Sequence, residues 1–143
     1  MEEKLIRSAF DVLDNSYAPY SGFNVAAAIL SDSGKIYTGV NVENASYPAG
    51  ICAECNAVSN MVSCGDKNIK AIAIVSRDTK APEGKDIGYT SPCGICRQVL
   101  REFSDPEELM IFMAKSETDF KVRTLEDLLP ESFGPESLRN REK

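Results

Sequence analysis

Three cysteines and one glutamate are the residues of this sequence best suited to chemistry. The chain has five cysteines and no histidine, which excludes nucleophiles activated by histidine and leaves thiolates and carboxylates as metal ligands. Cys93 and Cys96 are one helical turn apart, so both sulfurs can face one ion. Zinc held by three protein ligands keeps a fourth position for water and lowers the pKa of that water to about 7. We therefore predict that Cys52, Cys93 and Cys96 hold a catalytic Zn²⁺.

Glu54, two residues after Cys52, is the acid–base group that such a site needs. The stretches Cys52–Glu54 and Pro92–Cys96 match the zinc-deaminase pattern, in which a ligand, any residue and Glu are followed later by Pro-Cys-x-x-Cys. Either motif alone is weak, because a lone Cys-x-x-Cys is often structural or redox-active and a lone Glu often only complements a helix dipole. The two motifs in the correct order predict a hydrolase that replaces an amino group of a cytosine-type ring with oxygen.

Cys55 allows a different interpretation of the same cysteines. Cys52 and Cys55 share a helix face. Together with Cys93 and Cys96 they would form a closed structural site of four thiolates, with no position for water. The 37 residues between the two pairs (56–92) exceed the roughly 15–20 of common structural sites, and the neighbouring glutamate would have no role. We favour the open site of three thiolates.

The hydrophobic pattern predicts the elements that position these cysteines. From residue 35 onward it predicts alternating strands and helices over residues 35–42, 52–64, 69–75, 93–103 and 109–113. We interpret this order as two successive βαβ units with parallel strands. Both helices then begin at the carboxyl edge of the sheet, where ligands bind in open α/β folds. Cys52 begins the first helix and the Cys93–Cys96 pair the second, and thiols at helix N-termini have the lowered pKa that favours metal binding.

The rest of the chain completes one domain over residues 1–143, without a repeat or a linker. An amphipathic helix is predicted over residues 3–14. The apolar run 24–30 forms a hairpin with the strand that follows it, and residues 77–90 are a polar loop. Thr124 opens a short helix with a capping-box pattern.

The composition narrows the function classes. A net charge of −6 would repel a phosphate backbone, so we expect a small neutral substrate and no nucleic acid. No stretch of about 18 apolar residues is present, which argues against a membrane span. The acidic start Met1–Lys4 is unlike a signal peptide. We therefore expect a cytoplasmic protein.

Segments outside the zinc motifs carry a resemblance to a known family. They read Pro-Tyr-Ser-Gly-Phe at 19–23, Asn-Val-Glu-Asn at 41–44, Arg-Gln-Val at 97–99 and Leu-Leu-Pro-Glu-Ser-Phe-Gly-Pro at 128–135. With the zinc motifs, they make the chain resemble the cytidine deaminases of the small, homotetrameric class over nearly its whole length. The zinc motifs belong to the wider superfamily, whereas Asn-Val-Glu-Asn and Phe-Gly-Pro point to the enzymes that act on nucleosides.

The resemblance implies a fold, a reaction and an assembly. The fold is α/β, with three layers (α/β/α) and a five-stranded mixed sheet. The reaction is the zinc-dependent hydrolysis of cytidine or deoxycytidine to uridine or deoxyuridine with release of ammonia, which serves pyrimidine salvage. The assembly is a homotetramer, in which Tyr47 and Phe133 would complete the pocket of a neighbouring subunit.

The resemblance also implies the substrate-binding residues. Asn41 and Glu43 would hydrogen-bond the ribose, Phe23 would pack near the pyrimidine, and backbone groups of Ala53 would bind the edge of the base. Considered without the family, the two polar residues could equally be loop-turn residues. Phe23 and Phe133 could equally be ordinary core or interface aromatics.

One position departs from the family pattern. The residue after the catalytic glutamate is usually Arg in enzymes with three zinc thiolates, and here it is Cys55. Three thiolates leave the zinc centre with a net negative charge, which weakens its pull on water. Arg97 and the two helix N-termini are the groups that could compensate this charge. Two alternatives stay open: a deaminase of a related aminated nucleoside such as blasticidin S, and a non-catalytic protein with the four-cysteine zinc site.

Overall fold

The computed structural model describes residues 1–139. Its strands are β1 (Phe23–Ser31), β2 (Ile36–Val40), β3 (Ile69–Asp78), β4 (Met110–Ala114) and β5 (Phe120–Thr124). Its helices are α1 (Glu2–Leu13), α2 (Ala53–Ser63), α3 (Gly94–Glu102), α4 (Leu125–Leu128) and α5 (Pro135–Arg139), with a 3-10 turn η1 at Tyr47–Ala49. The predicted helices and the hairpin are present.

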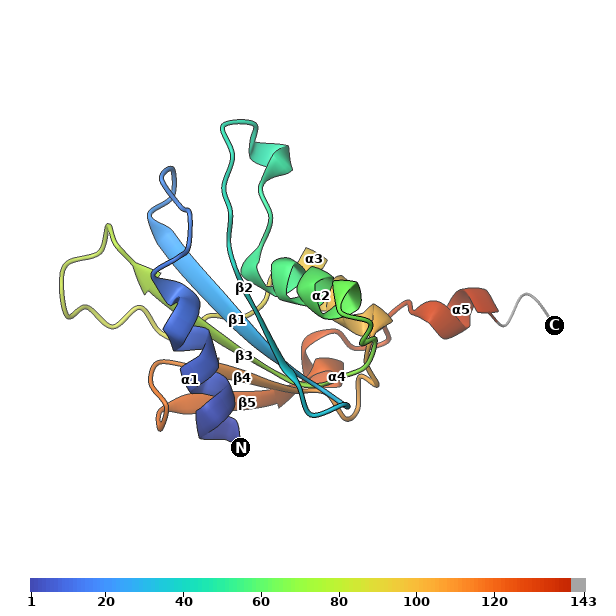
Figure 1. The fold of residues 1–143 in the computed structure, drawn as a ribbon. Coiled ribbons are helices and arrows are strands. Elements are labelled where there is room, and N and C mark those ends of the chain that lie inside the picture. Colours follow the sequence, from blue (N-terminus) through green and yellow to red (C-terminus); the bar gives the residue numbers. More distant parts are fainter. Residues whose placement is uncertain (140–143) are drawn as a thin grey trace.

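The strands form one mixed sheet in the order β2-β1-β3-β4-β5. Helix α1 packs on one face, and α2 and α3 pack on the other (Figure 1). This arrangement confirms the α/β/α layers and the five-stranded mixed sheet. None of the helices described between residues 1 and 139 has the length and apolar character that a bilayer crossing requires.

Strand β1 is buried on both faces because α1 covers one face of the sheet and α2 covers the other. Ala26 and Ala28 face α1, whereas Ala27 and Ile29 face α2, as the alternation of side chains along a strand requires. The small alanines let α1 lie close to the sheet. On the other face, longer aliphatic side chains fill the space beneath α2 and α3.

The sheet corrects one detail of the predicted topology. Strand β1 pairs antiparallel with both β2 and β3, so β2 and β3 run parallel, as predicted, without being neighbours. Only β3 and β4 form a directly paired parallel unit. Strand β3 also extends to Asp78, into the predicted loop 77–90, because Phe23 of β1 pairs with it there.

Gly39 of β2 sets the position of α2. A Cβ on this residue would lie 2.4 Å from the backbone nitrogen of Ala57 and 2.6 Å from the carbonyl oxygen of Ala53. The side-chain amide of Asn56 also donates a hydrogen bond of 2.8 Å to the carbonyl of Val40. The first turn of α2 therefore rests directly on the sheet.

The C-terminal part contains elements that the hydrophobic pattern did not predict, namely β5 and α5. Strand β5 pairs antiparallel with β4 and leads into α4, whose capping box between Thr124 and Asp127 was predicted. In Figure 1, α5 leads away from the sheet.

Candidate metal centre and active site

The predicted metal ligands meet where two helices begin. Cys52 is the N-cap of α2 and Cys93 is the N-cap of α3, and their sulfurs are 3.9 Å apart. The Sγ atoms of Cys52, Cys93 and Cys96 all lie within 4.8 Å of one another. The structure therefore brings together the three thiols that spacing alone had grouped.

The geometry of this group fits a zinc ion. Zinc–sulfur bonds of about 2.3 Å in a tetrahedral arrangement place two sulfurs about 3.8 Å apart. The observed 3.9 Å between Cys52 and Cys93 agrees with this spacing. A donor set made only of thiolates is also typical of zinc rather than of magnesium or calcium.

The thiols differ in how readily they ionise. Burial, together with the negative charge of Cys93, raises the pKa of Cys52 to about 11, and burial also raises the pKa of Cys96. Although burial opposes it, hydrogen bonds from the backbone and the thiol of Cys96 lower the pKa of Cys93 overall. A divalent cation would favour the thiolate form of all three, because its charge opposes the cost of burial.

Glu54 lies in the first turn of α2 and is only 5% exposed. Burial raises the pKa of its carboxyl group, since a carboxylate is less stable away from water. Ala53, beside it, is fully buried. A buried carboxyl with a raised pKa, close to a group of metal-ligating thiols, is suited to acid–base chemistry.

Cys55 is close to one of the three sulfurs but does not belong to their group. Its Sγ is 3.6 Å from that of Cys96, yet it is not among the atoms that lie within 4.8 Å of one another. This geometry favours three thiolate ligands over four. The fifth cysteine, Cys64, is exposed at the opposite end of α2.

Arg97 braces the loop that carries the second motif. Its Nε donates to the carbonyl of Pro92 at 2.8 Å, and its Nη2 donates to the hydroxyl of Ser91 at 3.0 Å. Its Nη1 donates to the carbonyl of Leu128 at 2.6 Å. The guanidinium is therefore bound to the backbone of Pro92, the residue that precedes Cys93.

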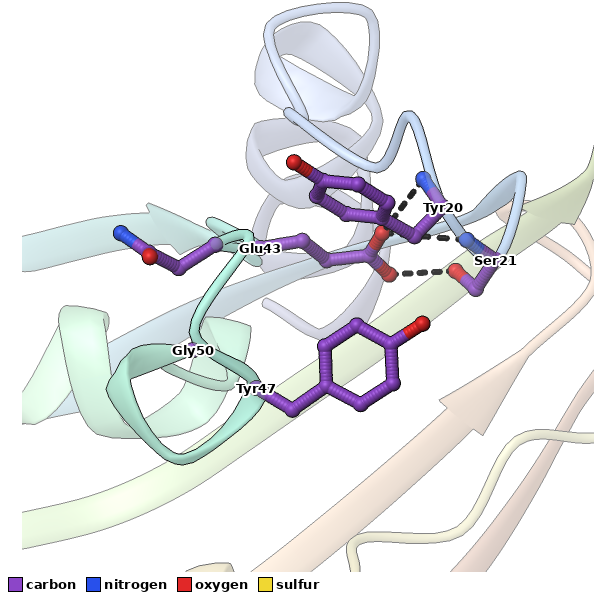
Figure 2. A pocket seen from close by; sticks show the side chains of 6 residues that line it. Tyr20, Ser21, Glu43, Tyr47 and Gly50 are labelled. Carbon is purple, nitrogen blue, oxygen red and sulfur yellow. Dashed lines mark hydrogen bonds between the residues drawn. The ribbon is translucent and has the colours of Figure 1, made fainter.

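A pocket of about 350 Å³ lies between the loop before β1 and the segment that joins β2 to α2. It is lined by Tyr20, Ser21, Glu43, Asn44, Tyr47 and Gly50. Figure 2 shows Glu43 reaching toward Ser21, with the rings of Tyr20 and Tyr47 on either side. The two ring centroids are 6.0 Å apart. The pocket has the size of a small-molecule site, although the three sulfurs do not line it.

The pocket and the metal centre are joined through the backbone. Val42 and Ile51 exchange two hydrogen bonds of 2.9 Å. Glu43 follows the first of these residues, and Cys52 follows the second. Because this bridge is antiparallel, Glu43 and Cys52 extend from it in opposite directions, and the bridge joins the pocket wall to the segment that leads to the first metal ligand.

Glu43 keeps one acceptor site for a ligand. Its Oε1 accepts hydrogen bonds from the backbone N–H groups of Tyr20 and Ser21, at 3.0 and 3.1 Å. Its Oε2 accepts one from the Ser21 hydroxyl, and these bonds lower the pKa of the carboxyl, the hydroxyl contributing most. Because each carboxylate oxygen can accept about two hydrogen bonds, Oε2 has one acceptor position left.

Asn41 ties the end of β2 to the start of β1. Its Oδ1 accepts hydrogen bonds from the backbone N–H of Val25 and the hydroxyl of Ser16. Its Nδ2 donates to the carbonyl of Phe23 at 2.9 Å, which leaves one amide hydrogen for a ligand. The amide therefore also fixes the backbone at Phe23, whose side chain is half-buried.

The structure does not bring Phe133 into this pocket. Phe133 is 57% exposed and lines a separate depression with Gln98 and Leu138. Tyr47 lines the pocket but is 76% exposed. Within one chain, both aromatic rings remain largely open to solvent.

Three residues that hold other segments in place were not singled out from the sequence. Tyr20 and Ser21 hold Glu43, and their loop was noted only as part of the family resemblance. Arg101 is buried on α3 and binds Ser132 and Glu136. A charged residue on the core side of an otherwise amphipathic helix was the signal that could have revealed it.

A group of three sulfurs at two helix N-termini, with a buried glutamate in the adjoining turn, defines the site of a zinc-dependent hydrolase on an α/β/α fold. Residues 1–113 match the family described as "Cytidine and deoxycytidylate deaminase zinc-binding region". The chain therefore belongs to this family, which confirms the resemblance seen in its sequence.

Individual relatives agree with the family assignment. The chain is 39% identical over 136 residues to a cytidine deaminase of Sporosarcina psychrophila, covering 95% of this chain and 93% of that protein. The crystal structure of cytidine deaminase from Burkholderia pseudomallei superposes with a TM-score of 0.81 at 36% identity, covering 93% of this chain and 99% of that one. The enzyme from Mycobacterium tuberculosis superposes with a TM-score of 0.75 at 39% identity, covering 92% and 95%.

Proposed function

We propose that this chain catalyses the hydrolytic deamination of cytidine and deoxycytidine to uridine and deoxyuridine, with release of ammonia. The observation that carries the proposal is the buried Glu54 beside three sulfurs whose spacing fits Zn²⁺. The relatives from Sporosarcina psychrophila and Burkholderia pseudomallei are named cytidine deaminases, and membership of their family supports the same reaction.

The residues of the metal centre divide the chemical work. Cys52, Cys93 and Cys96 would hold Zn²⁺, which supplies an activated water for attack on the aminated carbon. Glu54 would accept a proton from that water and donate it to the ring nitrogen next to the attacked carbon. It would then accept the remaining proton of the hydroxyl group on that carbon and donate it to the amino nitrogen, which leaves as ammonia. Acid–base transfer of this kind contributes about 10²–10⁴-fold to the rate.

The sugar of the nucleoside would bind at Glu43 and Asn41. Glu43 is held as an anion by three hydrogen bonds, and its free acceptor position suits a sugar hydroxyl, which is a donor. Asn41 keeps one amide hydrogen for a sugar oxygen. At the other end of the substrate, Phe23 would pack near the pyrimidine, and the backbone of Ala53 would bind the edge of the base.

A neighbouring subunit would complete the pocket. Tyr47 and Phe133 are exposed in the single chain, and Phe133 lies apart from the pocket that Tyr47 lines. An exposed aromatic ring is a common anchor of protein interfaces. We therefore propose a homotetramer with shared pockets.

Two further features complete the proposal. Arg97 would reduce the negative charge of the three thiolates from its position next to Cys93, together with the N-termini of α2 and α3. The acidic chain, with its net charge of −6, would act on free nucleosides rather than on nucleic acid, in the cytoplasm and in pyrimidine salvage.

A direct assay tests the reaction. The fall in ultraviolet absorbance as cytidine becomes uridine is followed with the purified zinc-loaded protein, and released ammonia is measured in parallel. Deoxycytidine and blasticidin S are assayed beside cytidine. We expect turnover of both pyrimidine nucleosides, with one ammonia released for each product.

Two outcomes would contradict the proposal. Tight zinc binding without ammonia release from any of the three compounds would support the non-catalytic four-cysteine site. Preferred turnover of blasticidin S would assign the chain to a different nucleoside, while leaving the chemistry of Glu54 unchanged.

A further inference from the structure

Side chains of α3 hold the segment 132–136 in place. The Nε2 of Gln98 donates to the carbonyl of Phe133 at 2.9 Å. The Nε of Arg101 donates to the hydroxyl of Ser132 at 2.8 Å, and its Nη2 forms an ion pair with the carboxylate of Glu136. The segment is therefore bound from both sides of the phenylalanine.

We call the contacts of Gln98 and Arg101 with the segment 132–136 the clamp. Arg101 is its least exposed part. Its side chain is 8% exposed, whereas that of Glu136 is 57% exposed. Burying a guanidinium is costly unless its donors are paired, and Ser132 and Glu136 pair them here. An arginine can hold two partners at once because its donors form a rigid planar fork.

Gly134 fits against the guanidinium of Arg101. A Cβ on this glycine would lie 2.4 Å from Cζ and 2.5 and 2.6 Å from the two terminal nitrogens. The backbone of the segment thus packs directly on the flat group, with no room for a side chain. This contact fixes the residue that follows Phe133.

The clamp holds an aromatic side chain that it does not bury. Phe133 stays 57% exposed although its neighbours on both sides are bound to α3. The same helix begins at Cys93 and carries Cys96. One helix therefore sets the position of two of the three proposed metal ligands and of the segment that carries an exposed phenyl ring.

We infer that Arg101 is a positioning residue, which fixes the place at which Phe133 is presented and thereby sets the affinity of the assembled site for its nucleoside. The inference rests on the proposed function, in which Phe133 reaches the pocket of a neighbouring subunit. Arg101 itself touches neither substrate nor metal in this account. Its effect should appear in substrate binding rather than in the chemical step.

Two variants disturb the clamp in different ways. Arg101→Gln removes the charge and the fork, whereas Gly134→Ala leaves both charges and pushes the guanidinium aside. We expect each to raise KM for cytidine about tenfold, because binding is weakened equally for the substrate and the transition state. The kcat should stay within about twofold of the parent, because the acid–base groups are unchanged. Zinc content should equal that of the parent. Arg101→Lys, which keeps the charge, should recover part of the affinity.

Arg123→Gln is the matched control, because it removes an exposed arginine of β5 whose side chain, among residues 1–139, donates its hydrogen bond to the carbonyl of neighbouring Val122. It should leave KM and kcat at the parent values. An unchanged KM in both clamp variants would overturn the inference. So would a loss of kcat and zinc content together, because that pattern indicates general damage to the fold.

A fluorescence measurement tests the clamp without relying on activity. The chain has no tryptophan, so Phe133→Trp places a single reporter at the clamped position. Time-resolved anisotropy should show a slowly rotating indole with Arg101 present and a fast local rotation after Arg101→Gln. Equal anisotropy decays would overturn the inference. If the parent protein failed to deaminate cytidine, the proposed function would fall, and this measurement would still decide whether Arg101 positions the segment.

Discussion

The metal centre and the pocket lined by Glu43 and Tyr47 are built from different kinds of structure. The metal ligands begin two helices that the sheet positions, and Cys96 and Glu54 are buried. The pocket wall consists of loops before β1 and between β2 and α2, and it exposes Tyr20 and Tyr47. The groups proposed for the chemistry therefore lie at two helix N-termini of one chain, whereas the residues proposed to bind the substrate lie largely in exposed loops.

This difference in structure predicts how substitutions in each region affect activity. A substitution in the metal centre removes a group for which no neighbour can substitute. A substitution in the pocket wall changes one of several contacts to the substrate. The comparison therefore predicts large losses in kcat at the first region and moderate changes in KM at the second.

The largest effect is expected from Glu54→Gln. The amide keeps the shape of the side chain but cannot carry protons, so turnover of cytidine should fall about 10²–10⁴-fold. Zinc content and melting temperature should stay near those of the parent. The exposed Glu3→Gln in α1 is the control and should remain fully active. Turnover at the parental rate would remove Glu54 from the mechanism.

A moderate effect is expected from Glu43→Gln. The variant loses the anion that holds the Tyr20–Ser21 loop. In the proposed function this anion also accepts a hydrogen bond from a sugar hydroxyl, so KM for cytidine should rise about tenfold while kcat changes little. The effect should be smaller for 2′,3′-dideoxycytidine, which lacks the hydroxyls. An equal effect on both substrates would show that Glu43 acts only on the loop.

A smaller effect, on stability alone, is expected at the opposite end of α2. Asp66 accepts hydrogen bonds from Tyr37, Ser33 and Ser31 at 2.6, 2.7 and 3.0 Å. These bonds lower the pKa of Asp66, and the bond from the Tyr37 hydroxyl contributes most. Its contribution to stability is then present above the unfolded-state pKa of about 3.9 and is lost as the pH falls through the lower folded-state value.

The corresponding variant is Asp66→Asn, with the exposed Asp32→Asn as its control. Thermal unfolding should show a lower melting temperature for Asp66→Asn at pH 7, and the gap to the parent should narrow as the pH falls below about 4. The kcat and KM for cytidine should not change. A gap that widens in acid would mean that the carboxylate does not stabilise the folded state.

The smallest effect is expected from Cys55→Ala. This thiol contacts Cys96 but lies outside the group of three sulfurs, so the variant should keep one zinc per chain and a kcat/KM within about twofold of the parent. Metal analysis and the cytidine assay measure both. Loss of zinc from an already inactive protein would instead identify Cys55 as a fourth ligand.

The two regions also differ in how far the sequence predicted them. Cys52, Glu54 and the Cys93–Cys96 pair follow from motif spacing and from the rule that both helices begin at one sheet edge. The insertion of β1 between β2 and β3 was missed, because the periodicity of each strand says nothing about which strands become neighbours. The prediction had therefore treated β2 and β3 as one βαβ unit from their order in the chain alone.

The pocket was predicted only through the family resemblance. Glu43 and Asn41 lie in an irregular segment, where no hydrophobic period indicates which side chains converge. The hydrogen bonds from Tyr20 and Ser21 to Glu43 join loops more than 20 residues apart in the chain, and such contacts follow from the tertiary fold. Arg101 was missed for the same reason, since its partners follow it by more than 30 residues.

X-ray absorption at the zinc edge of the purified protein tests the central claim most directly, because it counts the atoms bound to the metal. The account predicts three sulfurs at about 2.3 Å and one oxygen or nitrogen at about 2.0–2.1 Å. Four sulfurs, or a shell without sulfur, would contradict an open centre held by Cys52, Cys93 and Cys96.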